Sequence, residues 1–174
     1  PPPPHNHDKN FATMIRTVNL SSFEAGAALV QAQLNPVVLN FANAFNCGGA
    51  WCSSRGSQEE SLFTTSSLPL SLWPHRRVDD NRLPSCKLPR NTPAYPFSEL
   101  SILYSPHVSV THFDDGAPLP PYARPTLAVV SAAAQDLRGG RPWSAPYSHS
   151  LAVRKCRSVL CAAARHGHES VVLG

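Results

Sequence analysis

Short apolar segments separated by polar, proline-containing stretches define the elements of this 174-residue chain. Residues 23–34 are rich in helix formers, follow Ser22 as a candidate N-cap and end at Asn35-Pro36, so we predict one helix there. The β-branched run 37–41 comes next and predicts a buried central strand. Residues 58–66 begin with two acids, which favour a helix N-terminus, and predict a short second helix.

Prolines dominate the middle of the chain. Six of them lie within residues 68–97, which argues against regular structure of any length in that segment. Leu70, Leu72 and Trp73 are expected to pin this irregular insertion to the core. The prediction is therefore a long loop with a few buried anchors.

The second half of the chain alternates strands with one helix. Apolar residues recur at helical spacing between 147 and 166, with Gly167 as the C-terminal cap; they are Val153, Cys156, Val159, Leu160 and Ala163. Strands are predicted at 100–104 and 108–113 on either side of Ser105-Pro106, at 127–131 and at 171–173. This alternation indicates an α/β layer fold with a partly parallel sheet.

Composition fits one soluble domain behind a leader. The chain has a mass of 18.8 kDa, 42% apolar residues and 18 prolines, and no run of about 20 apolar residues that would span a membrane. Residues 1–10 are expected to be a disordered, proline-rich leader. The net charge of +4 and pI near 9.0 suit a polyanionic partner, but the basic residues are scattered, and the cluster at 75–77 is expected to be a solvated loop.

The five cysteines indicate reduced thiols in an intracellular protein, cytoplasmic or nuclear. Their number is odd, and Cys156 and Cys161 are predicted to lie within the apolar face of a helix. Cys47 and Cys52 have no second Cys or His pair at a zinc-ligand spacing, so no metal site is predicted.

Candidate chemistry is concentrated in residues 39–60, LNFANAFNCGGAWCSSRGSQEE. Gly48 and Gly49 follow the predicted strand and would let backbone N–H groups face an anion such as a diphosphate; taken alone, such a pair is more often a plain tight turn. Glu59 and Glu60 are neighbours on a helix and point about 100° apart, so they could divide the tasks of binding hydroxyls and transferring a proton. Favourable charge at a helix start is the simpler alternative.

Taken together, this segment resembles the signature of microbial-type poly(ADP-ribose) glycohydrolases, in which a glycine triplet is followed after six to eight residues by Gln-Glu-Glu. Here the triplet position holds Gly48-Gly49-Ala50, which we name the glycine loop (residues 48–50), and seven residues separate it from Gln58-Glu59-Glu60. The resemblance extends through Tyr104-Ser105-Pro106 to the strand 171–173. It implies a macrodomain-like three-layer α/β/α fold with a mixed, partly parallel sheet over residues 11–174.

The resemblance also implies roles. Glu60 corresponds to the catalytic acid, which would protonate the departing 2′-oxygen and later deprotonate water, and which would need a raised pKa. Glu59 would hold the ribose hydroxyls, while Asn40 is expected to be supporting rather than catalytic. The remaining ligand-binding positions are Asn43, Gly48, Gly49, Ala50 and Gln58. The reaction needs no cofactor, and the implied partners of a monomer are ADP-ribose and poly(ADP-ribose) or ADP-ribosylated proteins, with neither membrane nor nucleic acid.

Two departures from the family pattern change these expectations. Ala50 replaces the third glycine, which is tolerable where the local φ is negative. Family members continue from the strand 171–173 into a second glycine-rich loop, so a chain ending at Gly174 is expected to be an incomplete domain with weakened binding and low or absent turnover.

Three other functions stay open at this stage. A non-catalytic ADP-ribose-binding module would use the glycine loop without positioning the carboxylates. A thiol hydrolase would use Cys47 or Cys52 with a histidine. Nucleic-acid binding through the basic balance lacks a recognisable module. Trp51 is a candidate for lining the site, although an aromatic residue next to a loop is more often local packing.

Overall fold

The computed structural model describes residues 13–53, 56–72, 95, 98, 100–113, 116–137 and 146–174. The predicted leader 1–10 and most of the insertion 68–97, including Trp73 and the basic cluster, lie outside these residues. The elements are α1 (Ser22–Gln31), β1 (Pro36–Phe41), α2 (Gln58–Thr64), α3 (Leu68–Leu72), β2 (Leu103–Ser109), the 3-10 helix η1 (Pro121–Ala123), β3 (Thr126–Ala132), α4 (His149–Arg165) and β4 (Ser170–Val172).

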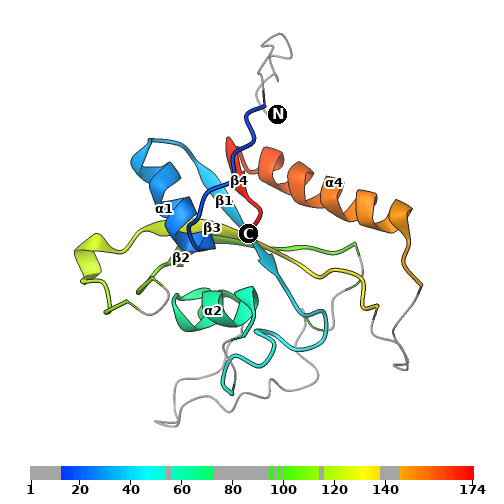
Figure 1. Cartoon of the computed structure of the whole chain (residues 1–174), viewed down its shortest axis with the longest axis horizontal. Helices are drawn as coiled ribbons and strands as arrows, with labels where there is room; N and C mark the ends of the chain where they lie inside the picture. Colours follow the sequence, from blue (N-terminus) through cyan, green and yellow to red (C-terminus); the bar gives the residue numbers. More distant parts are fainter. Residues whose placement is uncertain are drawn as a thin grey trace, which may run out of the picture.

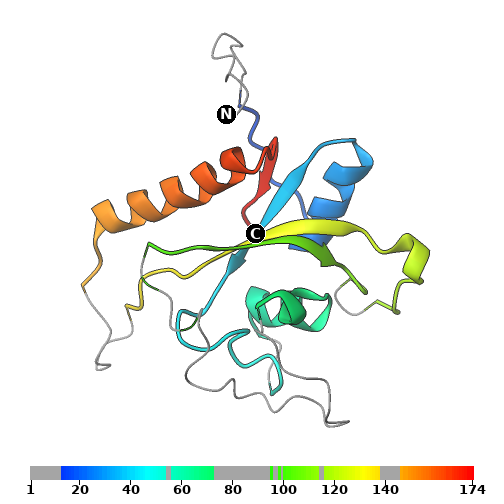
Figure 2. The same cartoon turned by 180° about the vertical axis from the view of Figure 1, so that it is seen from behind.

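A mixed sheet with the strand order β2-β3-β1-β4 forms the middle layer (Figures 1 and 2). β1 pairs in parallel with β3 and β4, whereas β2 is antiparallel to β3. Because successive strand residues face opposite sides, Val38 packs with α1, α2 and α3 while Val37 packs with α4. The predicted three-layer α/β/α fold with a partly parallel sheet is confirmed.

The first helix starts and ends earlier than predicted. Ser21, and not Ser22, is the N-cap, because it forms a capping box in which its N–H donates to Glu24 Oε2 at 2.8 Å and its Oγ accepts from Glu24 N–H at 3.4 Å. The helix ends at Gln31 and not at Leu34, and Gln33 takes a φ of 61°. A Ser-x-x-Glu pattern marks such a start, so the sequence contained the signal.

Pro69 and Pro106 interrupt regular structure less than expected. Leu68–Leu72 is helical, since Pro69 lies in the first turn, where its missing N–H costs no helical hydrogen bond. Leu72 is buried as predicted, but Leu70 is exposed. Residues 103–109 form one strand instead of two, because β2 is an edge strand whose register shifts between Ser105 and Val108, and an edge or bulge accommodates a proline.

Helix α4 is confirmed, with Gly167 at a φ of 74° directly after its C-cap. Its predicted apolar face is only partly buried: Val159 and Ala163 pack on the sheet, whereas Val153 and Leu160 are 44% and 53% exposed. The buried residues of α4 all lie in its C-terminal half. Among the helices of the described residues, none has both the length and the hydropathy that crossing a bilayer requires.

Candidate active site

The two adjacent acids of the sequence motif contact the glycine loop, beyond the carboxyl end of β1. Glu59 and Glu60 are in the first turn of α2, which begins after the N-cap Ser57. A Cβ placed on Gly49 would lie 3.4 Å from Glu59 Oε2 and 3.4 Å from Glu60 Oε1. Both carboxylates therefore converge on one point of the glycine loop.

Glu59 is almost completely buried, at 3% exposure. Its Oε2 accepts the Asn43 N–H at 2.8 Å and its Oε1 accepts the Gly48 N–H at 3.1 Å. Burial raises its pKa to about 7; the hydrogen bonds from Asn43, Gly48 and the Asn40 side chain oppose this shift, and the neighbouring Glu60 adds to it. Near neutral pH, Glu59 thus has access to both its neutral and its charged form.

Glu60 is also buried and is bound by backbone donors. Its Oε1 accepts the Ala50 N–H at 3.1 Å, and its Oε2 accepts the N–H groups of Gly56 and Ser57 at 2.8 and 3.1 Å. The last bond completes a capping box, since Ser57 Oγ accepts the Glu60 N–H at 3.4 Å. In this conformation Glu60 joins the glycine loop to the start of α2.

The N–H groups of the glycine loop are directed into the protein. Gly48 donates to Glu59, Ala50 donates to Glu60 and Gly49 donates to the Asn46 carbonyl at 2.9 Å. The predicted orientation toward an anion is therefore not the conformation observed. Ala50 meets the condition for a side chain at the third glycine position, because its φ is not positive.

A glycine is required at position 48. Its φ is 77°, and a Cβ there would lie 2.4 Å from Phe63 Cδ1 and 2.5 Å from Trp51 Cδ1. Trp51 packs on Phe63 with ring centroids 6.0 Å apart and joins the core cluster. Trp51 thus packs on the core and next to Gly48 of the glycine loop.

Asn43 and Gln58 have structural contacts in this conformation. Asn43 Oδ1 accepts the N–H groups of Phe45 and Asn46 at 2.9 and 3.0 Å, which shapes the turn after β1. Gln58 Nε2 donates to the Leu39 carbonyl at 2.7 Å, and its Oε1 accepts the Phe41 N–H at 2.9 Å. The Gln58 amide therefore pairs with the end of β1 as a neighbouring strand would.

Two residues of the site were not singled out from the sequence. Ser131 on β3 is fully buried and its Oγ accepts from Asn40 Nδ2 at 3.0 Å. Tyr95 is buried in the same core cluster as Cys47. A polar residue inside the apolar run 127–133 was a usable signal for Ser131, whereas Tyr95 lies in the proline-rich insertion and gave none.

The cysteines do not support thiol catalysis. Burial raises the pKa of Cys47 to about 12, which keeps it in the unreactive thiol form. Cys52 is disulfide-bonded, so the prediction of reduced thiols is wrong at this position, while Cys47, Cys156 and Cys161 are free. The predicted burial of Cys156 and Cys161 is also wrong, since both are exposed on α4.

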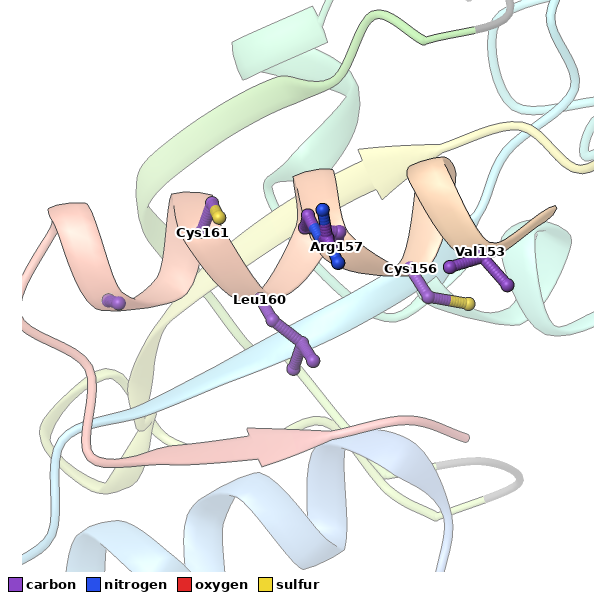
Figure 3. Close-up of a pocket in the computed structure, with 6 residues that line it drawn as sticks. Val153, Cys156, Arg157, Leu160 and Cys161 are labelled. Atoms are coloured by element: carbon purple, nitrogen blue, oxygen red, sulfur yellow. The ribbon is translucent and has the colours of Figure 1, made fainter. Parts of the chain in front are cut away.

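Neither a surface pocket nor a metal site adds a second candidate active site among the described residues. A pocket along α4 is bordered by Val153, Cys156, Arg157, Leu160, Cys161 and Ala164 (Figure 3). It contains neither carboxylate of the motif. Within the residues that the structure describes, no group of three or more His, Cys, Asp or Glu side chains could hold a metal ion.

Comparison with known proteins identifies the family. Residues 2–112 match the family model "Microbial-type PARG, catalytic domain". Among solved structures, the chain is similar to poly(ADP-ribose) glycohydrolase from Thermomonospora curvata bound to the inhibitor ADP-HPD (24% identity, TM-score 0.66, 88% of this chain and 55% of that chain). It is also similar to the enzyme from Deinococcus radiodurans in complex with ADP-ribose (26% identity, TM-score 0.65, 88% and 58%).

The chain thus spans between half and three-fifths of the length of these solved relatives. No curated protein matches it. The family match covers well over half of the chain and includes the glycine loop and both acids. The chain belongs to the family of microbial-type poly(ADP-ribose) glycohydrolase (PARG) catalytic domains.

Proposed function

We propose that this domain hydrolyses ribose–ribose O-glycosidic bonds in poly(ADP-ribose) and releases ADP-ribose. The observation that carries the proposal is the convergence of Glu59 and Glu60 on Gly49, each 3.4 Å from the position of its missing Cβ. Glycoside hydrolysis commonly uses a pair of carboxyl groups that flank the scissile bond. The site also lies past the carboxyl end of parallel strand β1, where ligands bind in open α/β sheets.

The proposed roles follow the family motif. Glu60 is the general acid that protonates the departing 2′-oxygen as an oxocarbenium-like ribose develops, and its carboxylate then deprotonates water. Glu59 binds the ribose hydroxyls. The other proposed ligand-binding positions are Asn43, Gly48, Gly49, Ala50 and Gln58. No step of this scheme needs a cofactor.

A second function is supported by a specific observation. All four carboxylate oxygens of Glu59 and Glu60 accept backbone N–H groups, so neither acid has an oxygen free of the protein's own donors. A hydrogen bond to a charged group contributes about 1.5–3 kcal/mol, so these backbone donors hold both acids in contacts within the protein. A non-catalytic ADP-ribose-binding module would not require either carboxylate to act on the substrate.

Calorimetric titration of ADP-ribose, combined with an assay for ADP-ribose released from poly(ADP-ribose), tests both functions. Glu60→Gln should abolish release, while the matched control Glu169→Gln, at an exposed position after α4, should leave release unchanged. Binding without release in the wild type would establish the binding module and refute the hydrolase. Absence of binding by the folded chain would refute both proposals.

Partners and compartment complete the proposal. We propose poly(ADP-ribose) and ADP-ribosylated proteins as the partners of a monomeric domain. An intracellular location, cytoplasmic or nuclear, stays a prediction based on the cysteines, and the disulfide at Cys52 counts against that argument.

A further inference from the structure

Basic residues are concentrated on helix α4. Of the six lysine and arginine residues that the structure describes, four lie on α4, and α4 contains no acidic residue. Lys155 is turned toward the sheet, where its Nζ donates to the Ala133 carbonyl. The other three, Arg154, Arg157 and Arg165, are exposed. The outer surface of α4 therefore carries positive charge that no acid of the same helix balances.

The three exposed arginines lie along one side of α4, and we name them the arginine row (Arg154, Arg157 and Arg165). Steps of three and four residues keep side chains on the same side of a helix, and such steps lead from Arg154 through Arg157 and Cys161 to Arg165. At about 1.5 Å per residue, the row extends over roughly 16 Å. Within the part of the chain that the structure describes, none of the three guanidinium groups has a hydrogen bond or an ion pair. Their donors are thus available to a ligand.

The stability of a solvated helix does not account for this row. Acids three or four residues away usually balance the basic residues of such a helix, and like charges at that spacing destabilise it. Arg154 and Arg157 are like charges at that spacing, and only Arg165 lies in the last turn, where the helix dipole favours a cation. Arg154 and Arg157 therefore gain nothing from the helix that carries them, which favours a role in binding.

An apolar hollow adjoins the arginine row (Figure 3). Its volume is about 420 Å³, and Arg157 borders it together with the exposed side chains of Val153 and Leu160. A guanidinium group stacks on planar rings and also binds phosphate oxygens through two parallel hydrogen bonds. The outer face of α4 thus offers contacts to a base and to a phosphate side by side.

The start of α4 is tied to the edge of the sheet at which the candidate active site lies. Phe41 and Ala132 are register partners at the carboxyl ends of β1 and β3. Shortly after Ala132, Gln135 Oε1 accepts the N–H of Ser148, the N-cap of α4, at 3.0 Å. Arg154 follows Ser148 by less than about two helical turns. Because α4 covers the face of the sheet opposite α2 (Figures 1 and 2), the arginine row is a separate surface that starts near the edge of the site and leads away from it.

We propose that the arginine row and the adjoining hollow of α4 form a second binding surface for poly(ADP-ribose), which holds units of the polymer other than the unit in the candidate active site. Each unit carries a diphosphate for the guanidinium groups and an adenine base for the hollow beside Arg157. The choice of this polyanion rests on the proposed function, since a polymer bound at the active site has its next units within reach of α4. A single ADP-ribose cannot occupy both surfaces, so the second surface favours long polymers.

The affinities for long poly(ADP-ribose) and for ADP-ribose, measured at several salt concentrations, test the proposal. In the triple variant Arg154→Gln, Arg157→Gln, Arg165→Gln, the Kd for the polymer should rise about tenfold or more at low salt, and the slope of log affinity against log salt should become shallower by about 2, since each phosphate contact contributes about 0.7. The Kd for ADP-ribose should change far less. Leu160→Ser should weaken polymer binding at an unchanged slope, because it removes apolar surface and no charge.

Arg124→Gln is the matched control for the single variant Arg157→Gln. Arg124 directly follows η1, which lies far from α4 in both views (Figures 1 and 2), so its loss changes the net charge equally without touching the arginine row. Polymer affinity should fall in Arg157→Gln and stay at the wild-type value in Arg124→Gln. Equal losses in these two variants, or an unchanged polymer affinity in the triple variant, would overturn the proposal. The arginine row is exposed, so its variants should fold.

Single-stranded DNA of comparable charge separates poly(ADP-ribose) from other polyanions. Weaker binding of the DNA supports the proposal, whereas equal affinity with an equal salt slope would overturn it in favour of a general surface for polyanions. The outcome is also distinct from that of the proposed function. If the polymer binds through the arginine row but is not hydrolysed, the proposed function alone is refuted. If it is hydrolysed and the triple variant binds it as the wild type does, the second surface alone is refuted.

Discussion

Replacement of Glu59 by glutamine should remove a pH dependence from the stability of the domain. Burial raises the pKa of Glu59 from 4.5 to about 7, so the folded state binds this proton more tightly than the unfolded state does. The stabilisation due to the neutral carboxyl group is complete below pH 4.5. It is lost progressively as the pH rises to about 7, and no further loss follows above that value.

The size of the effect follows from the shift. One pKa unit corresponds to about 1.4 kcal/mol, so the wild type should lose at most about 3.5 kcal/mol from this group between pH 4.5 and 8. Urea denaturation at several pH values and constant ionic strength gives the free energy of unfolding for wild type and Glu59→Gln. The difference between the two curves isolates Glu59, because it cancels groups common to both.

One such common group has the opposite sign. Burial lowers the pKa of His168, so its contribution is present above pH 6.5 and is lost as the pH falls below that value. Its contribution is the same in both proteins and leaves their difference unchanged. A stability difference that stays constant from pH 4.5 to 8 would refute the reasoning, as would an equal pH-dependent change in the exposed control Glu169→Gln.

Three further outcomes can be checked by simple measurements. Gly48→Ala should cost about 2–5 kcal/mol in urea denaturation, from a left-handed backbone and a clash with Phe63, whereas Gly167→Ala, with open space around its Cβ, should cost only about 1–2 kcal/mol; equal costs would contradict the packing. Gln58→Ala should cost about 1–3 kcal/mol, since it breaks the pairing with the end of β1; an unchanged denaturation midpoint would show that this pairing is dispensable. Iodoacetamide at pH 8 should label the exposed thiols of α4 in the folded protein but Cys47 only after unfolding, as judged by mass spectrometry, and fast labelling of Cys47 would contradict its burial.

The sequence predicted the layers of the fold because apolar periodicity follows burial. β1, β3, α2 and α4 lie where the pattern places them. The pattern wrongly predicted two strands in place of β2. Pro106 is accommodated inside this strand because β2 lies at an edge of the sheet, and the local sequence does not show which strand lies at an edge. Val153 and Leu160 of α4 belong to the apolar pattern of the sequence but are exposed.

The sequence motif predicted that the glycine loop and the two acids lie together, but it did not predict the hydrogen bonds among them. The spacing from Gly48 to Glu60 correctly brought the glycine loop and both acids together. The N–H groups that bind the carboxylates come from a turn that folds back over α2, and Ser131 reaches Asn40 across 91 positions of the chain. Such contacts depend on the tertiary fold, so only the structure could show them.

The same N–H groups that hold the two acids belong to the glycine loop, which we propose binds the diphosphate of ADP-ribose. Gly48 donates to Glu59 and Ala50 donates to Glu60, and each N–H group can serve one strong acceptor at a time. An anion bound by the glycine loop would therefore take these donors and release an oxygen of each carboxylate. With fewer donors, the pKa of Glu59 would rise further above 7. Diphosphate binding and the protonation of the site are thus linked by the geometry of one loop, and ADP-ribose should bind with uptake of protons near neutral pH.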